Sequence, residues 1–270
     1  MNVVVYPRIE ALPQWRLPAA NLDGSHAMRE RTLQATPLAT TVRPWAPGDA
    51  FNRIRWKSTA RHGDIQVKEF DLEQTADAWL VLDLERSIQR GSGDESTVEV
   101  GVRVAAAVAD KALVENRAVG MTINAHRLAQ LQPDRGGRQH LKIMQLLAAV
   151  EGDGSSPVSE ALVASVPRIR RGMTAVVITP SLDRAWVKPL AALRSRGVAC
   201  VVVSLDVPAF ERREQEEAAR RAGTSADDSP LPQPSATAQE WRALRHALAE
   251  FDIRVYRAGP AVPLSEALAS

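Results

Sequence analysis

The sequence predicts an α/β protein, a doubly wound and mostly parallel β-sheet flanked by helices. The first observation is a set of short apolar runs with the length of buried strands, at residues 79–84, 118–124, 174–179 and 198–205. The second is that segments with helical periodicity separate these runs, as parallel sheets with helical crossovers require. The third is Asp83 in the first run, because open α/β sheets place ligand sites where strands end.

The N-terminal part of the chain has a different pattern. It begins with a predicted strand at residues 2–6, followed by irregular chain over residues 11–41, where apolar residues show little periodicity. Asp49 is a suitable N-cap and Gly63 a suitable C-terminal stop, which predicts a helix over residues 50–61. We therefore expect this part to cover the sheet domain as a separate segment.

The predicted segment boundaries follow from these patterns. A strand at residues 65–70 completes an N-terminal covering segment over residues 1–75, and the α/β domain takes residues 76–270. A Pro-, Ser- and Asp-rich stretch at residues 223–237 predicts a flexible loop within that domain. The other elements expected in the domain are helices at residues 97–116, 140–150, 158–165, 185–196, 210–222 and 238–251, and a closing strand at residues 253–256.

The composition is that of a globular protein, with 45% hydrophobic and 24% charged residues in a chain of 270. The formal net charge of +2 gives no argument for nucleic-acid binding by the whole molecule. Cys200 is the single cysteine, so an intramolecular disulfide is excluded, which fits a reducing compartment. No stretch approaches the roughly 20 apolar residues of a membrane helix. We expect a cytoplasmic protein, with a peripheral location at the inner face of the membrane as the alternative.

Two tracts carry a family resemblance. Residues 44–70 read PWAPGDAFNRIRWKSTARHGDIQVKEF, and residues 79–87 read WLVLDLERS. Together they resemble the domain-of-unknown-function fifty-eight family, a bacterial family whose activity is largely undefined. The resemblance implies a fold similar to von Willebrand factor A domains, with a metal-ion-dependent adhesion site at the top of the sheet. It also implies work with a MoxR-type AAA+ ATPase, and family members often have an N-terminal membrane anchor.

The adhesion site of that fold is implied to have Asp-x-Ser-x-Ser on its first loop, a threonine on a second loop and an aspartate on a third. Such oxygen ligands suit a hard divalent cation. Asp83 and Ser87 match the first and third positions of the first loop, and Glu85 replaces the middle serine. Ser155 or Ser156 would occupy the threonine position.

The third loop departs from the adhesion-site pattern. Thr179 is followed by Pro180 and Ser181 where the pattern has Asp-Gly, although Asp183 is nearby in sequence and Glu85 could act as a direct ligand. The sequence therefore predicts a degenerate site that binds Mg²⁺ or Mn²⁺ weakly or not at all, and no other cofactor is expected. In the structural alternative, Asp83 caps a helix or pairs with a nearby arginine.

The basic segment has three interpretations. Arg53, Lys57 and Arg61 share one face of the predicted helix, which could contact phosphates or an acidic protein. We favour instead an internal role, in which acidic residues pair with these cations and Trp56 is a core anchor, with partner docking as the second choice. The expected counter-charges are Asp49, Glu69, Asp71 and Glu73. The motif residues expected to be structural or to dock a partner are Gly48, Asp49, Arg53, Trp56, Lys57, Arg61, Lys68, Glu69 and Phe70.

No catalytic residue is predicted, because the chain lacks the common phosphate-loop, dinucleotide, zinc-protease and serine-hydrolase motifs. The leading hypothesis is a non-catalytic protein-interaction or assembly module with a protein partner. The alternative from another class is a divalent-metal-dependent hydrolase or phosphoryl-handling enzyme centred on Asp83, with Glu85 and Asp183. Nucleic-acid binding through residues 53–61 is a weaker alternative, and no nucleic-acid partner is expected.

Overall fold

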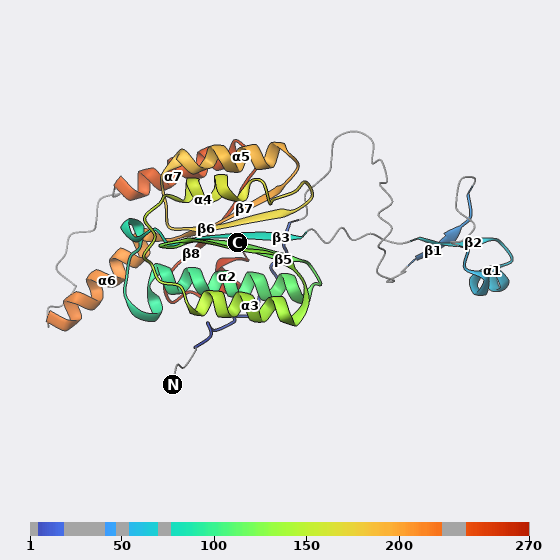
Figure 1. The fold of residues 1–270 in the computed structure, drawn as a ribbon, viewed down its shortest axis with the longest axis horizontal. Helices are drawn as coiled ribbons and strands as arrows, with labels where there is room; N and C mark the ends of the chain where they lie inside the picture. Colours follow the sequence, from blue (N-terminus) through green and yellow to red (C-terminus); the bar gives the residue numbers. More distant parts are fainter. Residues whose placement is uncertain (1–4, 19–40, 47–53, 70–76, 223–235, 270) are drawn as a thin grey trace. The chain divides into compact units, whose positions relative to one another are not determined.

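The computed structural model describes residues 5–18, 41–46, 54–69, 77–222 and 236–269. The chain divides into two compact units (Figure 1). The α/β unit contains Met1–Leu22 and Ala76–Ser270, and the small unit contains Asp23–Thr75. Within the described residues, no helix is long and apolar enough to cross a bilayer.

The α/β unit is built on a six-stranded sheet in the order β5-β4-β3-β6-β7-β8. Its strands are β3 (Ala78–Asp83), β4 (Val119–Asn124), β5 (Leu128–Asp134), β6 (Thr174–Thr179), β7 (Ala199–Leu205) and β8 (Arg254–Ala258). All neighbouring strands are parallel except β4 and β5, which are antiparallel. The predicted α/β class with a mostly parallel sheet is confirmed.

Helices cover both faces of this sheet (Figure 1). On one face lie α2 (Thr97–Val114) and α3 (Gly136–Ala148), and on the other lie α4 (Val158–Ser165), α5 (Val187–Ser195) and α7 (Ala236–Ala249). The charged helix α6 (Val207–Ala222) follows β7, and the short α8 (Leu264–Ala267) follows β8. This arrangement leaves the carboxyl ends of the parallel strands at one edge, where their loops gather.

Alternating side chains of the central strand divide the core in two. Leu80 and Leu82 pack with α2 and α3 in one hydrophobic cluster, whereas Trp79 and Val81 pack with α4, α5 and α7 in the other. The Trp79 ring lies across β4, where a Cβ atom on Gly120 would come within 2.5 Å of it. Close packing of this ring therefore requires a glycine at that position.

Residues 5–18 form an N-terminal strap that has no regular secondary structure but belongs to the α/β core. Leu12, Trp15 and Leu17 are each only 3% exposed. The Trp15 ring meets Tyr256 of β8 edge-on, with centroids 6.3 Å apart. The strap thus supplies apolar packing on the sheet face that α2 and α3 partly cover.

Polar contacts hold the strap near its middle and at its C-terminal end. The Glu10 carboxylate accepts a hydrogen bond from the backbone N–H of Leu264, at the start of α8, at 3.1 Å. At the C-terminal end, the Thr174 hydroxyl donates to the Pro18 carbonyl at 2.6 Å. The predicted strand at residues 2–6 is wrong for its described residues, since Val5 has no strand pairing; residues 2–4 lie outside the described part.

The small unit is a two-stranded antiparallel sheet with one helix. It contains β1 (Thr41–Pro44), β2 (Gln66–Glu69) and α1 (Trp56–His62). The helix begins later than the prediction, because Ile54 is still extended and forms a bridge to Val67 of β2. Gly63 ends it in the left-handed conformation at φ 80°, as the sequence predicts.

The small unit also corrects the expectation for Trp56. Ile54 and Val67 are buried in this unit, whereas Trp56 is 70% exposed, so the predicted core anchor is wrong for the interior of this unit. The side chains of Lys68 and Glu69 are not described, and Gly48, Asp49, Arg53, Phe70, Asp71 and Glu73 lie outside the described residues. The internal pairing of the basic segment therefore stays a prediction.

Several boundaries in the α/β unit differ from the predicted ones. The edge strand β5 and the helix α8 were not predicted. Helix α6 begins three residues earlier than expected, because the Asp206 carboxylate accepts from the backbone N–H of Ala209 at 3.2 Å and caps its first turn. Of the predicted loop at residues 223–237, residues 236 and 237 belong to α7, and the others lie outside the described part.

Candidate functional site

The carboxyl edge of the sheet contains a buried polar centre at a topological switch point. The chain leaves β3 toward β4 on one side and leaves β6 toward β7 on the other, although β3 and β6 are neighbours. Asp83 is the last residue of β3, Thr179 of β6 and Asn124 of β4. Strand pairing therefore brings these three side chains to the same edge.

Both carboxylate oxygens of Asp83 are bonded within the protein. Oδ2 accepts from the Thr179 hydroxyl at 2.6 Å. Oδ1 accepts from the Asn124 side-chain amide at 3.1 Å and from the backbone N–H of Glu85 at 3.2 Å. Asp83 has no exposed surface, so its carboxylate does not contact bulk solvent. The predicted helix cap or arginine ion pair is not its role.

The partners of Asp83 are themselves held by the surrounding loops. The Asn124 amide also donates to the backbone carbonyl of Ser156 at 2.7 Å. The Thr179 hydroxyl also accepts from the backbone N–H of Ser181 at 2.9 Å. Through these bonds, Asp83 connects the loops that follow β3, β4 and β6 with the loop between α3 and α4. We refer to Asp83, Asn124 and Thr179 as the Asp83 centre.

Burial and hydrogen bonding act on the Asp83 carboxyl in opposite directions. Desolvation raises the pKa of Asp83 above its ordinary value, since the charged form loses contact with water. The hydrogen bonds from Thr179, Asn124 and the Glu85 backbone counteract part of that increase, and the negative charge of Glu85 adds to it. The net result is a raised pKa, typical of a group buried for a structural or chemical reason.

The loop between α3 and α4 approaches the sheet edge closely because it contains Gly154. Its backbone N–H donates to the Leu84 carbonyl at 2.9 Å, and its carbonyl accepts from the Arg86 N–H at 2.8 Å. A Cβ atom at this position would lie 2.7 Å from the carbonyl oxygen of Asn124. Any larger residue would push the loop away from the Asp83 centre.

The other predicted site residues do not bond to the Asp83 carboxylate with their side chains. The Ser87 hydroxyl donates to the Glu85 carboxylate, which turns both groups toward each other. Ser155 is exposed, and Ser156 contributes only its carbonyl. The Asp183 carboxylate accepts from the backbone N–H of Ala185 at 3.0 Å and caps the short turn Arg184–Trp186.

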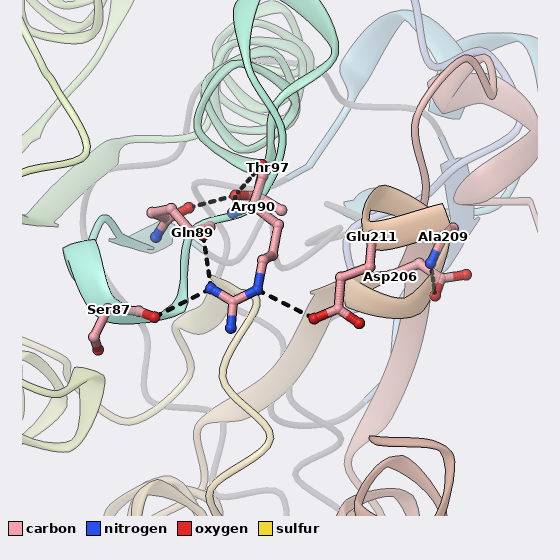
Figure 2. Close-up of polar contacts among 7 residues, drawn as sticks. All are labelled: Ser87, Gln89, Arg90, Thr97, Asp206, Ala209 and Glu211. Carbon is pink, nitrogen blue, oxygen red and sulfur yellow. Dashed lines mark hydrogen bonds and ion pairs between the residues drawn. The ribbon is translucent and has the colours of Figure 1, made fainter. Parts of the chain in front are cut away.

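The loop after β3 is fixed a second time by Arg90, as Figure 2 shows. Its guanidinium donates to the backbone carbonyls of Ser87 and Gln89 and to the Glu211 carboxylate of α6 at 3.1 Å. Thr97, the first residue of α2, donates to the Gln89 side chain at 2.7 Å. The loop is therefore attached to α2 and α6 as well as to the Asp83 centre.

Comparison with known proteins identifies the family. Residues 41–216 match the family profile described as "Protein of unknown function DUF58", which is more than half of the chain. The chain belongs to the DUF58 family. The match includes both the small unit's α1 and the Asp83 centre, so these two features belong to one family sequence.

Relatives of this DUF58 chain carry no assigned activity. The protein is 28% identical over 170 residues to "Uncharacterized protein Rv1480" of Mycobacterium tuberculosis (strain ATCC 25618 / H37Rv), with 61% of this chain and 53% of the relative covered. It is 28% identical over 123 residues to "Uncharacterized protein YeaD" of Bacillus subtilis (strain 168), with 45% and 29% covered. The chain thus spans about half the length of the mycobacterial relative.

Protein donors already engage the Asp83 carboxylate, and weak or absent binding of Mg²⁺ or Mn²⁺ there stays a prediction. Mg²⁺ and Ca²⁺ require several oxygen ligands with free lone pairs in a defined geometry. Here the Asp83 oxygens accept hydrogen bonds from protein donors, and the Ser87 hydroxyl is turned to Glu85. In the part of the chain that the structure describes, no group of three or more Asp, Glu, His or Cys side chains is placed to hold a metal ion.

We expect a calorimetric titration with Mg²⁺ or Mn²⁺ at neutral pH to give no saturable heat at micromolar metal. The physical reason is that a cation would have to displace the Asn124 amide and the Thr179 hydroxyl proton from the Asp83 carboxylate. The matched control is Asp183→Asn, which removes an exposed carboxylate at the same edge. Tight binding that Asp83→Asn abolishes and Asp183→Asn leaves intact would contradict this expectation.

Proposed function

We propose that this DUF58 protein is a non-catalytic protein-interaction or assembly module whose docking face is the carboxyl edge of its sheet. The observation that carries the proposal is the burial of Asp83 and the use of both its carboxylate oxygens by protein donors. Its carboxylate lies where α/β folds place reactive groups, yet it is buried and both oxygens are used by Thr179, Asn124 and the Glu85 backbone. A carboxylate in this state acts on the loops that it connects rather than on a substrate.

The side chains around the Asp83 centre support docking of a protein. The loops that follow β3, β4 and β6, together with the α3–α4 loop, are held by the bonds described above and present exposed polar side chains of both charges. A rigid rim of mixed charge favours recognition of a complementary protein surface, because no loop has to be ordered on binding. The exposed residues of this rim are Arg86, Ser87, His126, Arg127, Ser155, Asp183 and Arg184.

The partner class that we propose is a MoxR-type AAA+ ATPase, which the family resemblance favours. An ATPase ring presents the same surface on each of its subunits. The rigid, charged edge of the sheet could bind that surface without catalysing a reaction. The non-catalytic part of the proposal rests on the protein donors that bind both oxygens of the Asp83 carboxylate. The choice of partner rests on the family resemblance.

The test is a binding assay between the full chain and the purified MoxR-type ATPase of the same organism. We expect saturable binding that is insensitive to EDTA. The double variant Arg86→Glu with Arg184→Glu should bind about tenfold more weakly, because reversing charges on the rim of an interface lowers affinity by about that factor. Arg196→Glu is the control, since this exposed arginine follows α5 at the opposite edge of the sheet.

Two results would overturn the proposal. One is the absence of saturable binding, or equal losses for the double variant and the Arg196→Glu control. The other is hydrolysis of a phosphate or carboxylate ester by the purified chain that disappears in Asp83→Asn and remains in Asp183→Asn. The second result would establish the enzyme hypothesis in its place.

A further inference from the structure

The small unit exposes a large aromatic side chain that its own interior does not use. Trp56, the first residue of α1, is 70% exposed. The interior of the unit is filled instead by Ile54 and Val67, which are 8% and 2% exposed. An exposed tryptophan costs free energy in water, and it is typical of surfaces that meet another phase or another molecule.

Cations are close to Trp56 in the sequence of the small unit. Arg55 precedes Trp56 directly, Lys57 follows it, and Arg61 lies one helical turn after Lys57 on the same face. All three are exposed, and none forms an ion pair with a side chain that the structure describes. This end of the small unit therefore combines a concentrated positive charge with an exposed ring.

The small unit also exposes an aliphatic side chain. The backbone N–H of Arg55 donates to the Gln66 carbonyl at 2.7 Å, and the N–H of Gln66 donates to the Thr59 hydroxyl at 3.0 Å. These two bonds hold the start of β2 against the first turn of α1. Ile65, which directly precedes β2, is 42% exposed. It is thus a second exposed apolar side chain of the same unit.

We propose that Arg55, Trp56, Lys57, Arg61 and Ile65, the Trp56 corner, dock onto the headgroup region of an anionic lipid bilayer. Tryptophan prefers the interface between headgroups and acyl chains, because its ring is apolar and its N–H is polar. Lys and Arg near that interface are attracted to anionic headgroups, and Ile65 can enter the acyl boundary. This inference is independent of the docking face on the α/β unit.

The exposed isoleucine favours a lipid surface over a nucleic acid. Single-stranded nucleic acids are held by aromatic stacking and by cations along the backbone, and an aliphatic side chain contributes to neither. A bilayer interface uses all three kinds of side chain at the Trp56 corner. The net charge of only +2 for the whole chain also means that attraction to an anionic surface must come from a local cluster such as this one.

The expected effect can be stated as a ratio of affinities. Each Lys or Arg close to an anionic membrane surface increases binding by about fivefold, so three of them give a preference on the order of 100-fold for anionic over neutral vesicles. The preference should decrease as salt is added, because the attraction is screened within a Debye length.

The experiment is sedimentation of the full chain with vesicles of phosphatidylcholine alone and of one part phosphatidylglycerol to two parts phosphatidylcholine. We expect binding to the mixed vesicles only. The triple variant Arg55→Gln, Lys57→Gln and Arg61→Gln should lose that binding. The matched control neutralises three exposed arginines of the α/β unit outside the proposed docking face, Arg138→Gln, Arg170→Gln and Arg196→Gln, and should bind vesicles as the original chain does.

A second measurement locates the contact. Lipids brominated at the upper acyl chain should quench part of the tryptophan fluorescence of the original chain, and this quenching should vanish in Trp56→Phe, which keeps an apolar ring. Circular dichroism and thermal unfolding of each variant check that it is folded.

The proposal is overturned if the chain has no preference for anionic vesicles, or if the triple variant and Trp56→Phe behave as the original chain does. It is also overturned if a fluorescent oligothymidine binds saturably and loses binding in the triple variant while vesicles do not bind. That outcome would make the Trp56 corner a nucleic-acid surface.

Discussion

Asp83→Ala is expected to lower the free energy of unfolding of the α/β unit by about 2–4 kcal/mol, because it leaves buried donors without an acceptor. The Thr179 hydroxyl, one bond of the Asn124 amide and the backbone N–H of Glu85 would all lose their partner. Chemical denaturation followed by circular dichroism measures the change. Asp94→Ala is the control, since that carboxylate is exposed and should matter by less than about 1 kcal/mol.

Asp83→Asn should keep most of the free energy of unfolding. The difference in that free energy between the original chain and Asp83→Asn should depend on pH. Because the folded state raises the pKa of Asp83 above its ordinary value of 3.8, the folded protein binds this proton more tightly than the unfolded chain does. The contribution of Asp83 is therefore most favourable at low pH, and it declines as pH rises from 3.8 through the folded pKa. Asparagine stays neutral and has no such decline.

The stability of the original chain minus that of Asp83→Asn should thus decrease as pH rises through this window. A difference that stays constant with pH, or that increases, would mean that the Asp83 carboxyl is not held with a raised pKa. If Asp83→Asn were as unstable as Asp83→Ala, the negative charge of the carboxylate itself would be required. That result would support a cation bound at this position.

Trp15→Ala is expected to destabilise the α/β unit by about 3–5 kcal/mol, the usual range for removing a buried tryptophan. The ring is 3% exposed, contacts Tyr256 edge-on and belongs to the same hydrophobic cluster as α2. Gln14→Ala is the matched control, because its neighbouring side chain in the strap is exposed and should change stability by less than about 0.5 kcal/mol. Urea denaturation of both variants provides the measurement.

A small effect of Trp15→Ala, equal to that of Gln14→Ala, would show that the strap is not part of the folding unit. A loss of the full expected size would establish that residues before the small unit are needed by the domain that follows it. Trp56→Ala provides a further contrast, since its exposed ring should contribute little to the stability of the small unit.

The central strands were predictable from the sequence because each is buried on both faces. Residues of β3, β6 and β7 are buried along their whole length, which produces the continuous apolar runs that mark parallel strands. The edge strand β5 escaped prediction for the opposite reason. Its residues from Leu128 to Asp134 are exposed or partly exposed, so its sequence contains polar residues without a clear alternation.

The sequence predicted where the candidate site lies but not all of the residues and hydrogen bonds that form it. Topology alone places the ends of β3 and β6 side by side, which locates Asp83 and Thr179. Asn124 was missed although it ends an apolar run just as Asp83 does, because the adhesion-site pattern contains no asparagine. The direction of the Ser87 hydroxyl toward Glu85 depends on the loop backbone, and no spacing rule in the sequence specifies that.

Trp56 illustrates a limit of reasoning from residue type. Tryptophan is usually well buried, so a core role was the natural prediction for the one in the basic segment. In the structure, Ile54 occupies the interior position through its β-bridge to Val67, and the helix begins only at Trp56. Trp56 is therefore exposed within this unit. The adjacent cations, Arg55 and Lys57, were the signal that the ring belongs to a surface.

The contacts of Thr174 bear on whether the segment inserted into the α/β unit can be replaced. Its hydroxyl binds the carbonyl of Pro18, and its backbone N–H binds the carbonyl of Asp77 at 2.9 Å, so one residue of β6 holds both points where the chain leaves and re-enters the α/β unit. Entry and exit that meet at one place are what tolerated domain insertions have in common. A short linker from Pro18 to Asp77 should therefore close the chain of the α/β unit without opening its sheet.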